Sequence, residues 1–382
     1  MALLRSARFP AVLLLVAAAL GLLLANSPAA PAAFAIADAH LGLPGLIDLS
    51  VRHWISDGLL AIFFFAAAVE LQYELTTGQL NSAKRAVLPA LAAAGGVVVP
   101  VAVYLAVAAG SDAATGWPIP TATDIAFALG VLAVFGRGLP PTVRVFLLAL
   151  AILDDIVGIV FIAVLFTSDV DFGMILLALV CVVVFAFCSR LIDTRGRRWA
   201  IAGLVITGVG TWYAVYMSGV HATIAGVVLG LAMAQQPALR ARSAIEPWVN
   251  AIVLPLFALV AALVVIPQVP AAELSPAFWG VVIALPVGKL IGITGAGWIA
   301  QRALRVSPAQ ALPFADLLAA GALGGIGFTV SLLLSELAFA GAPGIRDQAT
   351  LGVLAGSAIS LVMAAALVSW RAWHHRRILR TA

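Results

Sequence analysis

Three aspartates lie in sequence that is otherwise as apolar as the interior of a membrane. Asp124 follows the short run 118–123, and Asp154 and Asp155 are neighbours within the apolar stretch 146–159. An ionised carboxylate in a membrane interior costs several kcal/mol unless another group pairs with it, so such residues usually serve a function. Carboxylates bind hard cations and protons. The spacing therefore predicts a cation or proton site.

The composition indicates that these carboxylates lie in a membrane protein. Of the 382 residues, 63% are hydrophobic and 10% are charged, and the mean hydropathy is +1.13. Soluble domains are about 45–50% apolar and about 25% charged. We therefore expect a single all-α transmembrane domain over 1–382, with a cytoplasmic N-terminus at 1–8 and a basic cytoplasmic tail at 371–382.

Twelve apolar segments follow one another along the chain and predict about twelve transmembrane helices. The first lies within 1–27, which also resembles a signal peptide because two arginines precede the apolar run; we favour an uncleaved helix. Residues 28–50 are rich in Ala, Pro and Gly and predict an external loop. The segments are 9–25, 52–73, 86–109, 119–135, 142–167, 172–190, 199–217, 219–235, 247–267, 277–301, 311–340 and 347–370.

The net charge of +4 and the pI of about 9.5 could indicate a nucleic-acid partner, but the positions of the basic residues argue against one. With a cytoplasmic N-terminus, eighteen of the 21 Lys and Arg residues fall in cytoplasmic segments, and only Arg52 and Arg346 fall outside. This bias is typical of multi-pass proteins in a lipid bilayer. We therefore expect both termini in the cytoplasm. The tail, with His374 and His375, is expected to be an anchor rather than a metal site.

Two of the twelve segments are interrupted. Pro118 and Pro120 remove backbone donors, so only 124–135 can form a regular helix in the fourth segment. Unwound backbone within a membrane must be satisfied by protein or a cavity, and two interrupted segments in separate halves of a chain point to a binding site at the midplane. The alternative is close helix packing at small residues. The glycines that cut the eleventh segment are Gly324, Gly325 and Gly327.

Six motifs, in order along nearly the whole chain, resemble the NhaA family of bacterial Na⁺/H⁺ antiporters. The resemblance implies twelve helices arranged as inverted repeats, with the interrupted fourth and eleventh segments crossing at the midplane. It implies antiport of Na⁺ or Li⁺ against H⁺ across the bacterial inner membrane, in sodium and pH homeostasis. The motifs are 54–64 (WISDGLLAIFF), 122–130 (ATDIAFALG), 149–155 (ALAILDD), 218–223 (SGVHAT), 254–258 (LPLFA) and 325–329 (GIGFT).

The same resemblance implies roles for individual residues. Asp155 and Asp154 would bind the cation and the protons, and Lys289 would lie near Asp154 as a compensating charge. Thr123 and Asp124 would lie at the crossing, where Asp124 also offsets the positive ends of helices. Three further residues fall on matching positions that we associate with the pH response or the external funnel: Asp57, Glu70 and His221.

The sequence departs from the family pattern in several places, of which two concern the pH response and a homodimer most directly. The family commonly has basic residues directly after the acid that corresponds to Glu70, whereas this chain continues with LQYE at 71–74, so no ion pair is available within that turn. The loop 28–50 looks too short and too rich in Pro and Ala for the β-hairpin that helps some members to dimerise. We therefore leave the pH response and a homodimer open.

The chemistry of the site follows from the geometry of a helix. Adjacent residues point about 100° apart, so Asp154 and Asp155 cannot aim equally at one ion. We expect Asp155 to be the principal ligand and Asp154 its partner, alternately paired with Lys289. Because Na⁺ and protons compete for the same carboxylates, exchange needs no covalent chemistry and no cofactor. Linked protonation of Lys289 would give two protons per Na⁺ and electrogenic transport.

Other hypotheses concern the remaining polar residues and other functions. We expect His221 to be hydrogen-bonded at a helix end, and Glu336 and Asp316 to be interfacial. A transporter of the same architecture could carry an organic anion with Na⁺, although two carboxylates disfavour an anion, and a homologue without transport could serve in sensing or assembly. An enzyme is not expected, because the sequence has no nucleophile cluster, phosphate loop or metal-ligand spacing.

Overall fold

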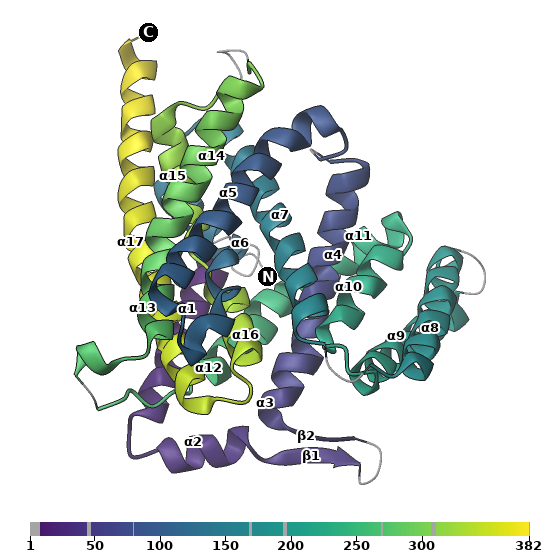
Figure 1. Ribbon diagram of the computed structural model, residues 1–382. Helices are drawn as coiled ribbons and strands as arrows, with labels where there is room; N and C mark the ends of the chain where they lie inside the picture. Colours follow the sequence, from purple (N-terminus) through teal and green to yellow (C-terminus); the bar gives the residue numbers. More distant parts are fainter. Residues whose placement is uncertain are drawn as a thin grey trace.

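The computed structural model describes residues 8–43, 47–78, 80–167, 170–193, 197–268, 270–306 and 311–381. Most of them lie in helices that form a bundle, and a two-stranded sheet lies at one end of it (Figure 1). The chain is therefore an all-α multi-pass membrane protein, as predicted. Residues 1–7, which make up most of the expected cytoplasmic N-terminus, and residue 382 of the tail lie outside the described residues.

Eight helical stretches within the described ranges are long and apolar enough to cross a membrane. Three bent helix pairs raise the number to eleven if each pair is one span. α10 (Thr223–Ala232) is apolar but rises only about 15 Å, half of a bilayer core. Twelve spans therefore require α10 as well, and that number stays a prediction. The eight stretches are 51–76, 86–108, 141–165, 172–191, 197–217, 235–261, 276–303 and 343–377.

Three of these stretches contain a wider, π-helical turn, a feature that often occurs at functional sites. The turn before Lys289 contains Pro286, which has no amide hydrogen and cannot continue the regular ladder. The turns join α3 (Val51–His53) to α4 (Leu60–Thr76), α11 (Gln235–Trp248) to α12 (Leu254–Ala261), and α13 (Pro276–Ile283) to α14 (Lys289–Ala303). The other long helices are α1 (Arg8–Ala25), α5 (Ala83–Ala108), α7 (Pro141–Leu165), α8 (Phe172–Leu191), α9 (Arg197–Met217) and α17 (Pro343–Thr381).

Both expected interruptions are present. The fourth segment runs from a short turn through extended backbone at 122–124 into α6 (Ile125–Phe135), with a bend of 47°. The eleventh consists of α15 (Phe314–Gly324) and α16 (Phe328–Ala338), bent by 49°. The carboxylate that precedes α6 accepts a hydrogen bond from the amide of Phe127, which fixes the start of this helix where the sequence predicted it.

Most of the described residues between 28 and 50 lie in a helix and two paired strands, so the prediction of a loop too short for a hairpin was wrong. α2 (Ala30–Ala37) precedes β1 (His40–Leu43) and β2 (Ile47–Ser50), which pair antiparallel. Alanine has the highest helix propensity, so the Ala-rich part forms a helix rather than a loop. Two strands of four residues need only a short connection. We call the end of the bundle that carries these strands the hairpin end.

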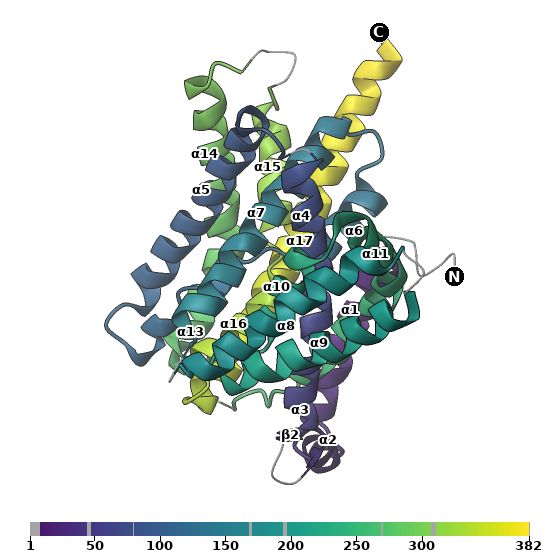
Figure 2. The same ribbon diagram turned by 90° about the vertical axis from the view of Figure 1, so that its right-hand side faces the viewer.

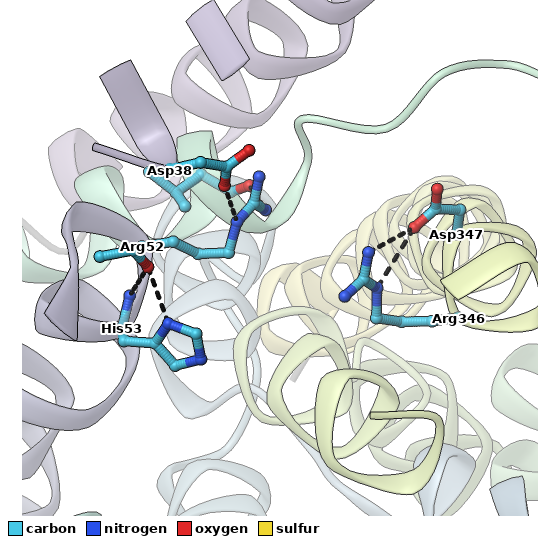
Figure 3. A network of polar contacts seen from close by, with 7 residues as sticks. Asp38, Arg52, His53, Arg346 and Asp347 are labelled. Carbon is cyan, nitrogen blue, oxygen red and sulfur yellow. Dashed lines mark hydrogen bonds and ion pairs between the residues drawn. The ribbon is translucent and has the colours of Figure 1, made fainter. Parts of the chain in front are cut away.

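Arg52 and Arg346, the two arginines that the charge pattern predicted on the outer side, both lie at the hairpin end. Arg52 Nε lies 3.3 Å from Asp38 Oδ1, and Arg346 Nη2 lies 3.1 Å from Asp347 Oδ1 (Figure 3). Arg52 also donates to the carbonyl of Val260 and so ties the hairpin to the end of α12. Each arginine therefore has a carboxylate partner, and neither leaves an isolated positive charge.

α17 continues as a helix beyond the apolar segment 347–370 and carries part of the expected tail. Arg371 Nε donates to Asp316 Oδ1 at 2.7 Å, and His375 Nε2 lies 3.1 Å from Asp316 Oδ2. Asp316 has no exposed surface, and its expected depth near the membrane interface stays a prediction. The continued helix brings Arg371 and His375 onto α15, where they contact this buried carboxylate.

Figure 1 and Figure 2 show how the helices are grouped. α17 packs along α13 and α15 on one side of the bundle, and α8 packs against α9 on the other. Between them α5 and α14 approach closely, because Gly95 and Gly292 leave room where the two backbones meet. The interior is occupied by the second broken segment, since α16 is buried continuously from Phe328 to Ser335.

Candidate functional site

The two interruptions meet inside the bundle. The amide of Asp124 donates to the carbonyl of Ile326 at 2.6 Å, and Thr123 Oγ1 lies 2.8 Å from the carbonyl oxygen of Gly324. Each break thus satisfies backbone groups of the other, as unwound backbone within a membrane requires. We call this contact between 122–124 and 324–327 the junction.

Asp124 caps two helices at the junction. One carboxylate oxygen accepts from the amide of Phe127 in α6, and the other accepts from the amide and the hydroxyl of Thr329 in α16, at 3.2 and 2.7 Å. Both helix N-termini present partial positive charge to this buried carboxylate. Asp124 thus lies at both helix N-termini, and its role in transport stays a prediction. Thr329 was missed as a site residue, although it ends the motif 325–329 and could have been inferred from it.

Asp154 is held by a lysine and a threonine. Lys289 Nζ lies 2.6 Å from Asp154 Oδ2 and 3.1 Å from Thr123 Oγ1, which itself lies 2.7 Å from the same carboxylate oxygen. The side chains of Asp154 and Lys289 have no exposed surface. Within the described ranges, Asp154 Oδ1 has no hydrogen-bond partner. The structure therefore brings together the three residues that the sequence associated, and their role in ion binding stays a prediction.

Asp155, the next residue of α7, lies in a different setting. It lines a cavity of about 240 Å³, together with Thr123 and Asp124. In the part of the chain that the structure describes, it makes no hydrogen bond or ion pair, although the charges of Asp154 and Lys289 act on it. Neighbouring side chains on a helix point about 100° apart, which explains why one aspartate faces α14 and the next faces the cavity.

The cavity extends from Asp155 to charged residues of a second group of helices. Glu70 of α4 and Arg242 and Glu246 of α11 line its other end. The exposed fraction of the side chain is 20% for Glu70, 28% for Arg242 and 49% for Glu246, so the cavity opens to the surroundings here. Because Glu70 lies on the part of α4 that is remote from β2, this opening faces away from the hairpin end.

Glu70 forms its ion pair with another helix rather than within its own turn. Arg242 Nη1 lies 2.5 Å from Glu70 Oε2, and Arg242 Nη2 lies 4.0 Å from Glu246 Oε1. The turn 71–74 offers no basic partner, as predicted, and Gln72 there donates to carbonyls at the end of α10 instead. The sequence missed Arg242 because the pairing depends on how α4 and α11 pack.

Asp57 and His221 meet at the hairpin end. His221 Nε2 lies 3.5 Å from Asp57 Oδ1, and His221 Nδ1 lies 2.7 Å from the hydroxyl of Thr223, the first residue of α10. The expectation of a hydrogen-bonded histidine at a helix end is confirmed. Neither residue lines the cavity. Glu336 is half-buried on α16, where the charges of Arg52 and Arg346 act on it, and it does not line the cavity either.

The glycines of the second break let the backbones approach at the junction. A Cβ at Gly325 would lie 2.7 Å from the carbonyl oxygen of Leu285, and one at Gly327 would lie 3.1 Å from the carbonyl oxygen of Ala122. A Cβ at Gly324 would collide with a side chain of α14. The glycines therefore pack closely at a segment that is also broken, and whether they serve an ion site stays a prediction.

The groups around the junction suit a hard monovalent cation. Carboxylate, hydroxyl and carbonyl oxygens are the ligands that hard cations prefer. Asp154 pairs with the buried ammonium of Lys289, whereas Asp155 lines the cavity, so the two adjacent carboxylates carry one more charge than the lysine and a cation or a proton can neutralise it. The oxygens available are the carboxylates of Asp124, Asp154 and Asp155, the hydroxyls of Thr123 and Thr329, and the carbonyls of the two breaks.

Comparisons with known proteins agree with the motifs. A family model described as Na⁺/H⁺ antiporter 1 matches residues 1–368. The chain is 56% identical over 383 positions to Na(+)/H(+) antiporter NhaA 2 of Clavibacter michiganensis, covering 98% of this chain and 93% of that relative. It is 44% identical over 373 positions to Na(+)/H(+) antiporter NhaA of Tropheryma whipplei, covering 96% and 95%. A third relative, Na(+)/H(+) antiporter NhaA 2 of Rhodococcus jostii, is 43% identical over 350 positions, covering 88% and 84%. The chain therefore belongs to the NhaA family of Na⁺/H⁺ antiporters.

Proposed function

We propose that this protein exchanges Na⁺ for H⁺ across a membrane, and that Asp155 and Asp154 carry the exchange. The observation that supports this most directly is the unequal setting of the two neighbours. Asp154 is sealed against Lys289, whereas Asp155 lines a cavity that opens to the surroundings. A cation that enters the cavity can therefore reach one of the two carboxylates while the other remains compensated.

Competition for the same oxygens would couple the two fluxes. A cation at Asp155 excludes a proton from that carboxylate, and a proton there removes the charge that holds the cation. Thr123 and Asp124 line the same cavity and can contribute oxygens to a partly dehydrated Na⁺ or Li⁺. The junction would then alternate in its exposure to the two sides of the membrane, so that each ion leaves on the side opposite to its origin.

Lys289 would set the stoichiometry. If the ammonium leaves Asp154 when the cation binds, Asp154 becomes available as a second ligand. If Lys289 then loses its proton, two protons move for each Na⁺, and the cycle transfers net charge. The 2.6 Å contact between Lys289 and Asp154 supports this proposal, because it makes the charge of one residue depend on the partner of the other.

We also propose that the end of the bundle opposite the hairpin faces the cytoplasm, in the inner membrane of a bacterium. Both termini would then be cytoplasmic, and the cavity would open to the cytoplasm. The excess of basic residues predicted on that side supports this orientation. Exchange at this site would serve sodium and pH homeostasis, with Glu70 contributing to the pH response, and Asp57 and His221 belonging to the outer funnel.

We propose that the protein forms a homodimer, which the sequence left open and the observed β-hairpin supports. The paired strands 40–43 and 47–50 are the kind of element that was expected to be absent, and one side of each strand has no partner strand within the described residues. Addition of a strand from a second copy to such an edge is a general mode of association. A homodimer in the membrane is therefore compatible with this fold.

The experiment that tests the proposed function is transport by the purified protein. In liposomes with an acidic interior, the ΔpH would be followed while Na⁺, Li⁺ or K⁺ is added at several pH values. We expect Na⁺ and Li⁺ to collapse the ΔpH, K⁺ to have no effect, and Asp155→Asn to be inactive. Folded wild-type protein that responds to no cation between about pH 6 and pH 9 would overturn the proposal, since that range spans the usual titration of perturbed carboxylates and histidine.

A further inference from the structure

The mouth of the cavity carries a positive charge on the route of a cation. Arg242 is the single Lys or Arg among the described residues that line the cavity, whereas four of the lining residues are acidic. Its guanidinium lies between Glu70 and Glu246, at 2.5 and 4.0 Å from their carboxylates. A cation that enters the cavity at this end therefore passes this group, which repels it.

The guanidinium is a fixed charge. Arginine remains protonated throughout the physiological range, and its planar donors suit carboxylate partners. With Glu70 and Glu246 ionised, the three side chains carry two negative charges and one positive charge, and so a net charge of −1. Removing the positive charge would leave −2 at the mouth, and removing one carboxylate would leave zero.

Such a charge acts on the cation in two ways. It lowers the concentration of cations at the mouth, because clefts lined by one sign of charge concentrate ions of the opposite sign. The guanidinium also forms an ion pair with Glu70. Without this ion pair, the Glu70 carboxylate near the opening would compete with Asp155 for the cation. Both effects weaken the attraction of cations to the cavity from the aqueous phase without touching the junction.

We propose that Arg242 is a specificity-determining residue that sets the apparent affinity for Na⁺ by fixing the net charge of the cavity mouth. The inference rests on the proposed exchange function. It assigns to Arg242 a role in the approach of the cation rather than in its binding at Asp155. Glu70 and Glu246 are the two carboxylates through which the role is exerted.

The charge account makes opposite predictions for opposite charge changes. In the liposome assay at low ionic strength, Arg242→Gln should lower the apparent KM for Na⁺ roughly two- to fourfold, the size expected for one charge about 10 Å away in a largely aqueous opening. Glu70→Gln should raise it by a similar factor. Glu70→Gln combined with Arg242→Gln restores the net charge and should return the apparent KM to the wild-type value.

Two variants separate the charge of the mouth from general effects. Arg242→Lys keeps the charge and should keep the apparent KM. Arg240→Gln removes the same charge two residues away on α11, where the side chain pairs with Asp193 outside the cavity, and should leave the apparent KM unchanged. The shifts should shrink when choline chloride raises the ionic strength, because the Debye length falls to about 8 Å at 0.15 M.

A purely structural role for Arg242 predicts a different pattern. If the arginine only braces α4 against α11, Arg242→Gln would reduce folded protein and the maximal rate at unchanged KM, and the double variant would be no better. An apparent KM that is unchanged or raised in Arg242→Gln, in preparations where wild-type protein exchanges Na⁺, overturns this inference alone. Absence of exchange in the wild-type protein would instead overturn the proposed function.

Discussion

Asp154 and Asp155 are adjacent in sequence but lie in two different regions of the molecule. On one side of α7 the carboxylate of Asp154 and the ammonium of Lys289 have no exposed surface and pair with each other beside the Thr123 hydroxyl. On the other side a carboxylate with no partner in the described chain lines an open cavity. The comparison shows that a step of one residue along a helix can separate a group that holds the fold together from a group that is available to an ion.

Among single substitutions at these sites, the largest loss of stability is expected at the buried pair of Asp154 and Lys289. Breaking a buried ion pair by removing one partner costs about 3–5 kcal/mol, because the remaining charge is left uncompensated. Lys289→Met removes the ammonium and retains much of its volume. We therefore expect the free energy of unfolding in detergent to fall by about 3–5 kcal/mol, with a lower thermal midpoint.

The matched control is the double variant Lys289→Met with Asp154→Asn. It removes both charges, and replacing a whole buried pair is often close to neutral, so most of the lost stability should return. If the single Lys289→Met variant were as stable as wild type, the ion pair would contribute nothing to the stability of the fold. The claim that Asp154 and Lys289 hold the fold together would then be wrong.

The junction between the two regions should respond to added volume. At Gly327 a Cβ would lie 2.8 Å from Leu285 Cδ2 and 3.1 Å from the carbonyl oxygen of Ala122, and it would meet the Ser331 hydroxyl. Overpacking of this kind costs about 1–3 kcal/mol. We expect Gly327→Ala to lose that much stability. Gly341→Ala, where nothing lies within 4 Å, should lose almost none, and equal losses at both positions would contradict the packing account.

The cavity side should show the smallest effect on stability. Asp155→Asn removes a charge that has no hydrogen-bond or ion-pair partner in the described chain, so the free energy of unfolding should change by less than about 1 kcal/mol. The same variant should lose exchange in liposomes. A Tm that falls as far as that of Lys289→Met would mean that the two aspartates are not separated in role as the structure indicates.

The sequence predicted the features that depend on local backbone chemistry. Pro118 and Pro120 cannot donate backbone hydrogen bonds, and the glycines from 324 to 327 have no side chains, so both breaks were visible before the structure. The assignment of Asp154 to Lys289 came from the family resemblance, and the 2.6 Å contact confirms the proximity. The expectation that 28–50 is too short and too rich in Pro and Ala for a β-hairpin was wrong, because composition alone did not reveal the pairing of β1 with β2.

The remaining features depend on contacts between distant helices. Nothing near Glu70 in the chain indicates Arg242, since the pairing exists only because α11 packs against α4. The ion pair of Asp316 likewise depends on a distant helix. α17 continues past the apolar segment, and its Arg371 therefore contacts Asp316 on α15. Hydrophobicity patterns identify spans but do not specify which polar groups on them will meet.

The most direct test of the central claim is the number of protons released when Na⁺ binds. Purified protein in lightly buffered detergent solution would be mixed with NaCl, and the pH of the solution followed, with choline chloride as the control for ionic strength. Competition at Asp155 predicts that wild-type protein acidifies the solution on addition of Na⁺ and that Asp155→Asn does not. Equal proton release from both proteins would contradict the account, because the protons would then come from groups other than the one that faces the cavity.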